Sequence, residues 1–225
     1  MKKIIISLGG SLICPEKLDV VFIRKFKELI EDYTKKDFLF FIVCGGGKLC
    51  RDYQNSANEL RKLSNEESDW LGITATKLNA QFIKSIFKED LVFDEVIDNP
   101  QVAINTKKKI IIGSGYKPGC STDHDAVLLA QKQNTDTIIN MSNITHVYDR
   151  DPKTNTKAKK LEMISWKVYR EIISDTWSPG LNTPFDPTAS KKAESLGLKT
   201  YIIGSDLDNL KNIFDDKEFV GTAIS

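Results

Sequence analysis

Residues 4–11, Ile4-Ile5-Ile6-Ser7-Leu8-Gly9-Gly10-Ser11, join an apolar run to a pair of glycines. The same junction recurs twice: Phe38 to Val43 leads into Gly45-Gly46-Gly47-Lys48, and Ile110-Ile111-Ile112 leads into residues 113–119, GSGYKPG. A buried strand followed by a glycine loop and a helix aims backbone N–H groups and a helix N-terminus at an anion. We therefore expect the three loops at one edge of one sheet, where they would form a cradle for a polyphosphate.

Apolar and amphipathic stretches alternate along almost the whole chain. Strands are predicted at 3–8, 38–44, 91–97, 109–114, 135–141, 199–204 and 219–224. Helices are predicted at 19–35, 48–62, 66–88, 122–133, 165–174, 187–196 and 207–214. Several strands are apolar at consecutive positions, which is typical of sheets covered on both faces. The fold class is therefore α/β, a three-layer α/β/α sandwich with a mainly parallel central sheet, and right-handed crossovers place the glycine loops at its carboxyl edge.

The 225 residues fit one large domain or two small lobes. A boundary near residue 130 would separate the lobes, but no linker-like segment stands there. We expect a single domain over 1–225 with lobes at about 1–130 and 131–225 that share one sheet. The segment 175–186 is predicted to be a loop, because residues 177–184 within it are rich in turn-forming types.

Composition narrows the range of partners and compartments. The chain has 32 Lys and Arg against 31 Asp and Glu, a formal charge of +1, which gives no reason to expect a nucleic-acid or membrane-surface binder. No stretch approaches the length of a membrane span, and the apolar run at the N-terminus is too short for a secretory signal. Four cysteines without C-x-x-C spacing and two histidines indicate no metal site built on these residues. We expect an intracellular, cytoplasmic protein with free thiols.

Several familiar catalytic motifs are missing from the sequence. There is no G-x-x-x-x-G-K-[ST] loop, and Pro118 stands where a dinucleotide fingerprint would have its third glycine. The signatures of protein kinases and α/β-hydrolases are also absent. The glycine junctions therefore need another explanation.

Charged and hydroxyl residues beside these junctions are the candidates for chemistry. Lys48 and Arg51 fall in the first turn of the predicted helix, where cations oppose the helix dipole, so a bound phosphate explains them better than turn chemistry does. Ser121, Thr122 and Asp123 follow the third loop. A helix cap accounts for one or two of them, and a ligand site for the group; both remain open.

Two further acidic positions allow two interpretations each. Asp69 begins a long predicted helix, where an acid complements the dipole or binds a ligand. Tyr148-Asp149-Arg150-Asp151-Pro152 follows the 135–141 strand. This segment suits a pocket for a base and a ribose, and it equally suits a turn.

Taken in order, these motifs make the chain resemble the amino acid kinase superfamily and, within it, the archaeal-type UMP kinases. The resemblance covers nearly the whole chain. It rests on residues 8–12 (LGGSL), 44–51 (CGGGKLCR), 69–73 (DWLGI) with Asn79-Ala80, 115–123 (GYKPGCSTD), Ser142-Asn143 with Val147-Tyr148 and Asp151-Pro152, and Phe185-Asp186-Pro187.

The resemblance implies phosphoryl transfer from Mg-ATP to UMP, with Mg²⁺ as cofactor and a homo-oligomer, a hexamer, as assembly. It implies an acceptor side at about 1–130 and an ATP side at about 131–225. The implied UMP-binding residues are Gly46, Asp69, Gly115, Ser121 and Thr122. The implied ATP-binding residues are Gly9, Gly10, Gly47, Arg51, Ser142, Asn143, Tyr148 and Asp151. Asp123, Asp186 and Lys48 are implied at the reaction centre, and no residue is assigned as a direct metal ligand.

The chain departs from the family pattern at three places, one of which is the segment 177–186, which is unlike the usual stretch of small residues. Ser7 stands where many members carry a lysine, and Thr145-His146 replaces the usual Asp-Gly turn. Two alternatives therefore accompany the UMP kinase hypothesis. One is a kinase of the same fold with another small acceptor, such as isopentenyl phosphate, carbamate or an amino acid. The other is a nucleotide-binding sensor or storage protein without turnover.

Overall fold

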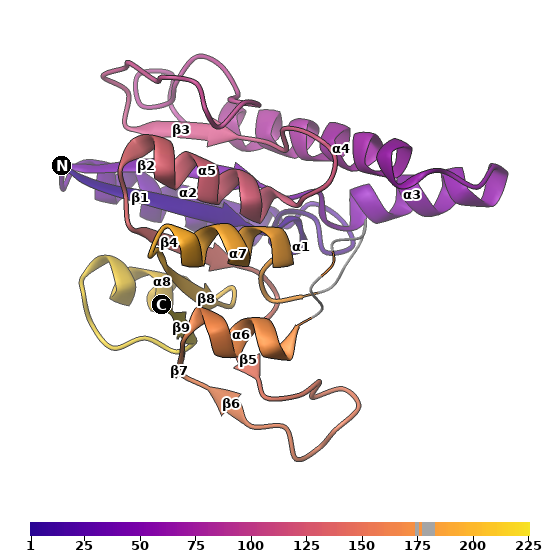
Figure 1. The fold of residues 1–225 in the computed structure, drawn as a ribbon. Helices are drawn as coiled ribbons and strands as arrows, with labels where there is room; N and C mark the ends of the chain where they lie inside the picture. The colour runs from indigo at the N-terminus through magenta and orange to yellow at the C-terminus, as the bar shows by residue number, and fades with distance from the viewer. Residues whose placement is uncertain (174–175, 177–182) are drawn as a thin grey trace.

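A seven-stranded sheet forms the centre of the protein, which is described here by a computed structural model covering residues 1–173, 176 and 183–225 (Figure 1). The strand order is β3-β2-β1-β4-β8-β9-β7. All neighbours run parallel except β8 and β9. The strands are β1 (Lys2–Leu8), β2 (Phe38–Cys44), β3 (Ile110–Gly113), β4 (Thr137–Met141), β7 (Met163–Ile164), β8 (Lys199–Ile203) and β9 (Thr222–Ile224); β5 (Val147–Tyr148) and β6 (Lys160–Leu161) pair separately.

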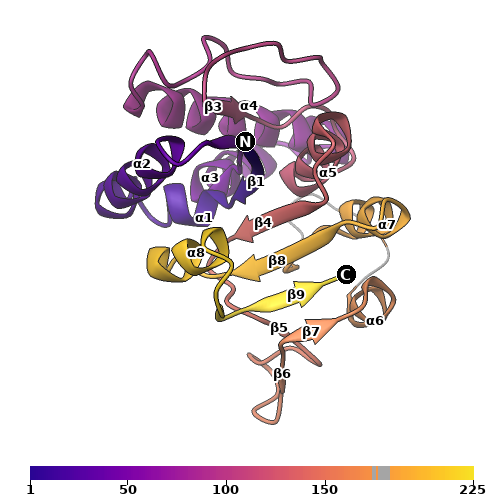
Figure 2. The ribbon, with the colours of Figure 1, turned by 90° about the vertical axis from the view of Figure 1, so that its left-hand side faces the viewer.

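Helices cover both faces of this sheet, as Figure 2 shows in a view along it. They are α1 (Gly10–Ile13), α2 (Val20–Thr34), α3 (Gly47–Leu60), α4 (Asn65–Ile86), α5 (Thr122–Gln133), α6 (Trp166–Ile172), α7 (Pro187–Ser195) and α8 (Leu207–Phe214). One core joins alternate residues of β1 to Phe26 of α2, Ile83 of α4 and Leu210 of α8. The other joins Ile5 to residues of α5, α6 and α7. The predicted three-layer α/β/α sandwich is confirmed.

The central strands are buried on both faces, as their continuous apolar runs predict. All seven residues of β2 are buried. In the register, Leu8 lies opposite Cys44 of β2 and Met141 of β4, so these three strands end side by side. The sheet runs without interruption across residue 130, because β4 pairs directly with β1.

Most predicted elements are present, and the differences have simple causes. The predicted strand at 91–97 is wrong: only Val92 and Ile97 form isolated bridges with β3. A bend at the exposed Asp94 and Glu95 interrupts the pairing between them. The helix α1 and the strands β5, β6 and β7 have two to four residues each, too few to show a periodicity. Within the predicted loop at 175–186, residues 175 and 177–182 lie outside the described residues.

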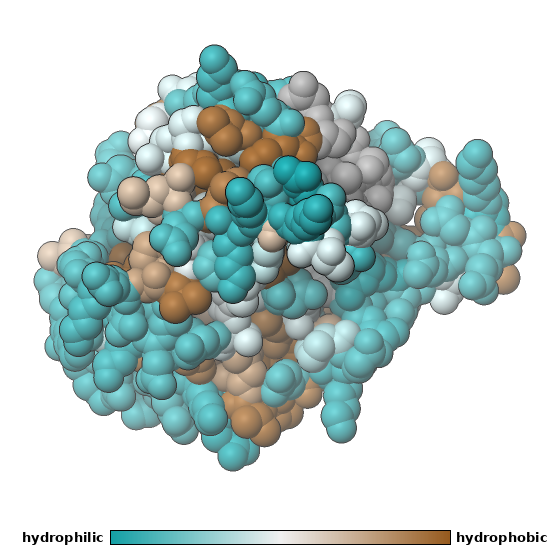
Figure 3. Space-filling view, turned by 90° about the horizontal axis from the view of Figure 1, so that it is seen from below, coloured by the Kyte–Doolittle hydropathy of each residue, from teal (hydrophilic) through white to brown (hydrophobic). Residues whose placement is uncertain are grey.

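The face seen from below in Figure 3 is mainly hydrophilic, with apolar side chains gathered in separate patches. Met163 of β7 is 83% exposed and Val168 of α6 is 41% exposed. Among the helices that the structure describes, none has both the length and the apolar character needed to cross a bilayer.

Candidate active site

The loops that follow β1, β2 and β4 meet at the carboxyl edge of the sheet. The amide of Gly9 donates to the carbonyl of Met141 at 2.7 Å, and the amide of Gly45 donates to the carbonyl of Leu8 at 2.9 Å. These bonds tie the three strand ends together. Two of the three predicted glycine loops, at 9–11 and 45–48, therefore meet at this edge, together with the loop after β4.

A cleft of about 510 Å³, here called the central cleft, opens between these loops. It is lined by Ser7, Gly9, Gly10, Ser11, Gly45, Gly46, Gly47, Cys50, Arg51, Gln54, Ser121, Thr122, Asp123, Asn140, Ser142, Asn143, Ile144, Thr183 and Pro184. Glycines and small polar side chains thus make up much of its wall. Such a surface suits an anion that accepts many hydrogen bonds.

Two glycines in this wall touch through their backbones. A Cβ on Gly10 would lie 2.0 Å from the amide nitrogen of Gly47, and a Cβ on Gly47 would lie 2.2 Å from the carbonyl oxygen of Gly10. Gly47 also has φ +65°, a conformation that side chains disfavour. The first two loops can approach this closely only because both positions are glycine.

Asp123 lines the central cleft and is hydrogen-bonded to the buried Asp186. Oδ1 of Asp123 accepts from the Ser7 hydroxyl at 2.8 Å and from Nδ2 of Asn140 at 2.7 Å. Oδ2 of Asp123 accepts from the backbone amide of Asp186 at 3.2 Å. The buried Asp186 caps α7 through Ala189 and accepts from the amide of Ser121 at 2.9 Å. The pair therefore joins β1, β4, α5 and α7 at one point.

The surroundings of Asp123 disfavour its ionised form. Burial raises the pKa of the Asp123 carboxyl to about 7, and the nearby charge of Asp186 acts in the same direction. The hydrogen bonds from Ser7 and the Asp186 backbone oppose this shift. Acids with strongly perturbed pKa values in a cleft are typical of functional sites.

A second hollow of about 150 Å³, here called the α4-side hollow, adjoins the central cleft. It is lined by Gly46, Cys50, Gln54, Asp69, Gly72, Ile73, Thr76, Gly115, Tyr116, Lys117, Cys120, Ser121, Thr122 and Asp125. Gly46, Ser121 and Thr122 also line the central cleft. The two spaces therefore adjoin at these residues.

The loop at 113–119 forms one wall of the α4-side hollow, and side chains hold its amides. Gly115 N–H donates to Thr76 at 2.8 Å, Tyr116 N–H to Asp125 at 3.1 Å and Gly119 N–H to Asp69 at 2.8 Å. The expectation that the amides of residues 113–116 face an anion needs correction. The amides of Ser114, Gly115 and Tyr116 bond to the protein itself, because this loop packs against Ile97, α4 and α5.

A third hollow of about 510 Å³, here called the β5-side hollow, extends the central cleft in the other direction. Tyr148 and Asp151 line it, and it shares Asn143, Ile144, Thr183 and Pro184 with the central cleft. Tyr148 and His146 give it aromatic walls, while Asp151 supplies a carboxylate. The three spaces form one elongated site.

Most residues predicted for the site line one of these spaces. The buried Asp186 lines none of them, and neither does Lys48. Its ammonium lies 2.7 Å from Asp52 and 3.8 Å from Glu16, and it is not part of the wall of the central cleft. The ion pair with Asp52, one helical turn away, explains this orientation. The geometry therefore gives no support to Lys48 at the reaction centre, whereas Arg51 lines the cleft.

Sequence reasoning assigned no role to several polar residues that shape the site. Nδ2 of Asn79 donates to the carbonyls of Gly45 at 2.8 Å and Gly46 at 3.1 Å, and so holds the second glycine loop. Asn140 binds Asp123, and the buried Gln54 lines two of the three spaces. Asn140 could have been noticed as a polar residue inside an apolar strand just before its carboxyl end. Gln54 carries no such signal.

The acidic pair fits a magnesium ion that is held mainly by nucleotide phosphates. The described part of the chain contains no group of three or more His, Cys, Asp or Glu residues able to enclose a metal. Oδ2 of Asp123 and both carboxylate oxygens of Asp186 each accept one hydrogen bond from the protein, which leaves each a lone pair. Mg²⁺ prefers such oxygen ligands and commonly combines one or two carboxylates with phosphate oxygens.

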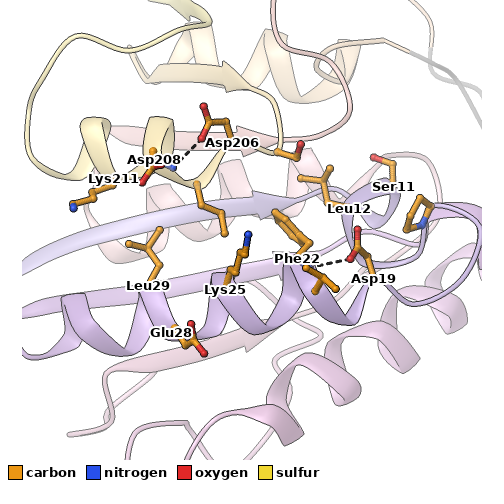
Figure 4. Close-up of a pocket in the computed structure, with 14 residues that line it drawn as sticks. Ser11, Leu12, Asp19, Phe22, Lys25, Glu28, Leu29, Asp206, Asp208 and Lys211 are labelled. Atoms are coloured by element: carbon orange, nitrogen blue, oxygen red, sulfur yellow. Dashed lines mark hydrogen bonds between the residues drawn. The ribbon is translucent and has the colours of Figure 1, made fainter.

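A separate hollow of about 820 Å³ lies between α2 and α8 (Figure 4). None of the predicted site residues lines it. Asp19 and Asp206 line this hollow, and they accept hydrogen bonds from backbone amides in the first turns of α2 and α8. Their carboxylates are thus explained as helix caps.

Comparisons with known proteins agree with this geometry. The family model described as amino acid kinase family matches residues 2–204. The uridylate kinase of Archaeoglobus fulgidus is 34% identical to this chain over 224 residues, which cover 99% of this chain and 100% of that protein. The uridylate kinase of Pyrococcus abyssi is 38% identical to it over 208 residues, which cover 90% of each protein. The solved structure of the Archaeoglobus fulgidus enzyme superposes with a TM-score of 0.83 at 32% identity and full coverage of both chains. A UMP kinase from Bacillus anthracis, at 19% identity and a TM-score of 0.77 over 100% of this chain and 96% of that one, shares the fold.

Proposed function

This chain belongs to the amino acid kinase family, and we propose that it transfers the γ-phosphoryl group of ATP to UMP, giving UDP and ADP. One observation carries the proposal. A single elongated site joins the α4-side hollow, the central cleft and the β5-side hollow, in a chain 34% and 38% identical to two uridylate kinases over nearly its full length. Two nucleotides arranged head to head need a site of this shape.

UMP occupies the α4-side hollow in this proposal. Oδ2 of Asp69 holds the Gly119 amide, and Oδ1 remains for the ribose hydroxyls. Gly46, Ser121 and Thr122 line both this hollow and the central cleft, so they lie where the UMP phosphate would meet the second nucleotide. Gly115 contributes the wall behind the nucleoside.

ATP occupies the β5-side hollow and the central cleft. Tyr148 and Asp151 flank the adenosine, and Asn143 lies where the two spaces join. Gly9, Gly10, Gly47, Arg51 and Ser142 surround the phosphates in the central cleft. This arrangement assigns the acceptor to residues 1–130 and ATP to residues 131–225, together with the first two glycine loops.

Catalysis in this arrangement consists of aligning the two nucleotides and neutralising their charge, because the protein takes little part in the covalent chemistry of phosphoryl transfer. The UMP phosphate already carries charge near neutral pH, so its oxygen attacks without a general base. Mg²⁺ would be held by phosphate oxygens with Asp123 and Asp186, and it would withdraw negative charge from the transferring group. Arg51 supplies a side-chain cation in the central cleft.

Ser7 fits this scheme although many family members carry lysine there. Its hydroxyl donates to Asp123 at 2.8 Å and, together with Asn140, fixes the carboxylate. Ser7 therefore orients an acid instead of supplying a charge. A role in pyrimidine nucleotide synthesis, a cytoplasmic setting and a homohexameric assembly belong to the same proposal and follow from the resemblance to UMP kinases.

An acceptor screen tests the proposal against the two alternatives. Purified protein with Mg-ATP is offered UMP, CMP, isopentenyl phosphate and carbamate, and products are identified by ³¹P NMR. We expect UDP with UMP, and about 10²-fold or greater loss in Asp123→Asn. The matched control is Asp32→Asn, because Asp32 is an exposed acid on α2 paired with Lys35. Turnover with another acceptor and none with UMP rejects the proposal, and nucleotide binding without turnover favours a sensor.

A further inference from the structure

Asp125 is a buried acid in the α4-side hollow that the scheme above leaves without a function. It lies in the first turn of α5 and is only 3% exposed. Its Oδ2 accepts the Tyr116 amide at 3.1 Å. Its Oδ1 is shielded from solvent, and no residue in the described part of the chain donates a hydrogen bond to it.

A buried carboxylate oxygen without a partner destabilises the folded protein. Such groups are uncommon in folded proteins and call for an explanation. Here the carboxyl belongs to the wall of the proposed acceptor site, so a donor on the acceptor would complete its hydrogen bonding.

We propose that Oδ1 of Asp125 accepts a hydrogen bond from the N3–H group of uracil and thereby selects UMP over CMP. This inference rests on the proposed function. Asp69, in the same hollow, has one free oxygen for the ribose hydroxyls. The N3–H group is the only N–H on the uracil base, whereas cytosine presents a lone pair at N3 that a carboxylate repels. Because Oδ1 is shielded, the Asp125 side chain turns into the hollow when the base enters.

The effect on specificity arises because replacing Asp125 affects the binding of UMP and of CMP differently. A pocket built to bond a donor rejects an analogue without it, because its own buried polar group is then left unpaired. In Asp125→Asn, the amide oxygen keeps the Tyr116 bond and the NH₂ group takes the place of Oδ1. That NH₂ group opposes uracil N3–H and accommodates cytosine N3.

The experiment compares UMP, CMP and dUMP with wild type, Asp125→Asn and the control Asp32→Asn. We expect the UMP/CMP ratio of kcat/KM to fall at least about tenfold in Asp125→Asn, through a raised KM for UMP and with kcat within about threefold of wild type. CMP is measured as a competitive inhibitor where it is not turned over. The UMP/dUMP ratio and the control variant should not change.

Each outcome decides the inference. An unchanged UMP/CMP ratio overturns it, and so does a changed UMP/dUMP ratio, which would mean that Asp125 contacts the sugar. If Asp125→Asn does not fold, Asp125→Ser is judged by the same ratios. If neither folds, wild-type binding of N3-methyl-UMP decides: affinity equal to UMP overturns the inference, and about tenfold weaker binding supports it. UMP turnover by wild type tests the proposed function separately.

Discussion

Replacing Gly10 by alanine tests whether the backbone contact between the first two glycine loops sets the geometry of the central cleft. The added Cβ would lie 2.0 Å from the Gly47 nitrogen and 2.5 Å from the Gly46 carbonyl carbon. Both neighbours are backbone atoms, so no side chain can rotate away. Reaching an ordinary contact of 3.4 Å requires the two loops to separate by about 1.4 Å.

The expected losses of rate and of stability follow from that displacement of the two loops. Shifts of about 1 Å in groups that align reactants cost about 10²-fold in rate. Overpacking of this kind costs about 1–3 kcal/mol in the free energy of unfolding. We therefore expect Gly10→Ala to keep a folded structure with kcat for UMP phosphorylation reduced about 10²-fold.

The assay is coupled detection of ADP release at saturating UMP and Mg-ATP, with urea denaturation on the same samples. Gly197→Ala is the matched control. Gly197 has φ +63°, so alanine there is strained, but no atom lies within 4 Å of its Cβ position. This variant should lose about 1–2 kcal/mol of stability and keep wild-type kcat, because it follows α7 and lies outside the three spaces.

One result would refute the reasoning about Gly10. If Gly10→Ala retains more than about half of wild-type kcat while losing as much stability as Gly197→Ala, the contact affects folding and not alignment.

Three further predictions concern charged residues of the site. Asp69→Asn should raise the Kd for UMP about tenfold or more and leave ATP binding within about twofold by calorimetry, and equal losses would contradict its placement in the acceptor hollow. Arg51→Met should reduce kcat/KM for ATP about 10²-fold, whereas Lys48→Met should reduce it less than about threefold. The reason is that Arg51 lines the central cleft and Lys48 does not. A larger loss in Lys48→Met would support a role for Lys48 at the reaction centre. The raised pKa of Asp123, about 7, means that the folded state holds its proton more tightly than the unfolded state, so stability is highest below the unfolded value and falls as pH rises toward 7. Urea denaturation of the nucleotide-free protein at pH 5.5 and 7.5 should show this loss, and Asp123→Asn should show a smaller one; a stability that rises over this interval would reverse the sign of the argument.

The framework of the site could be predicted from sequence because it depends on local signals. Apolar runs such as Phe38 to Val43 specify buried strands, and the glycines after each run mark where the strand ends and a loop begins. Parallel strands joined by right-handed crossovers end at one edge, so the loops had to meet. The helix at 122–133 was predicted with its observed bounds, because Ser121 caps it and Asn134 ends it in a left-handed conformation.

Hydrogen-bond partners could not be predicted in the same way. The sequence placed the amides of the 113–116 loop toward an anion, but Thr76 and Asp125 accept them in the structure. Lys48 was expected at the reaction centre, yet Asp52 on the same helix holds its ammonium. In each case a competing partner lay within reach of a side chain, and a one-dimensional pattern does not rank such partners.

The sequence by itself therefore determined the α/β/α architecture and the edge at which the first two glycine loops meet, and most of the residues that it singled out line one of the three spaces. Only the tertiary structure decided that Asn79 holds the second glycine loop, that Ser7 and Asn140 orient Asp123, and that Asp125 is buried with one oxygen unpaired. The physical reason is the range of the forces involved. Strand and helix formation respond to neighbours a few positions apart, whereas each of these polar contacts joins segments brought together only when the sheet is assembled.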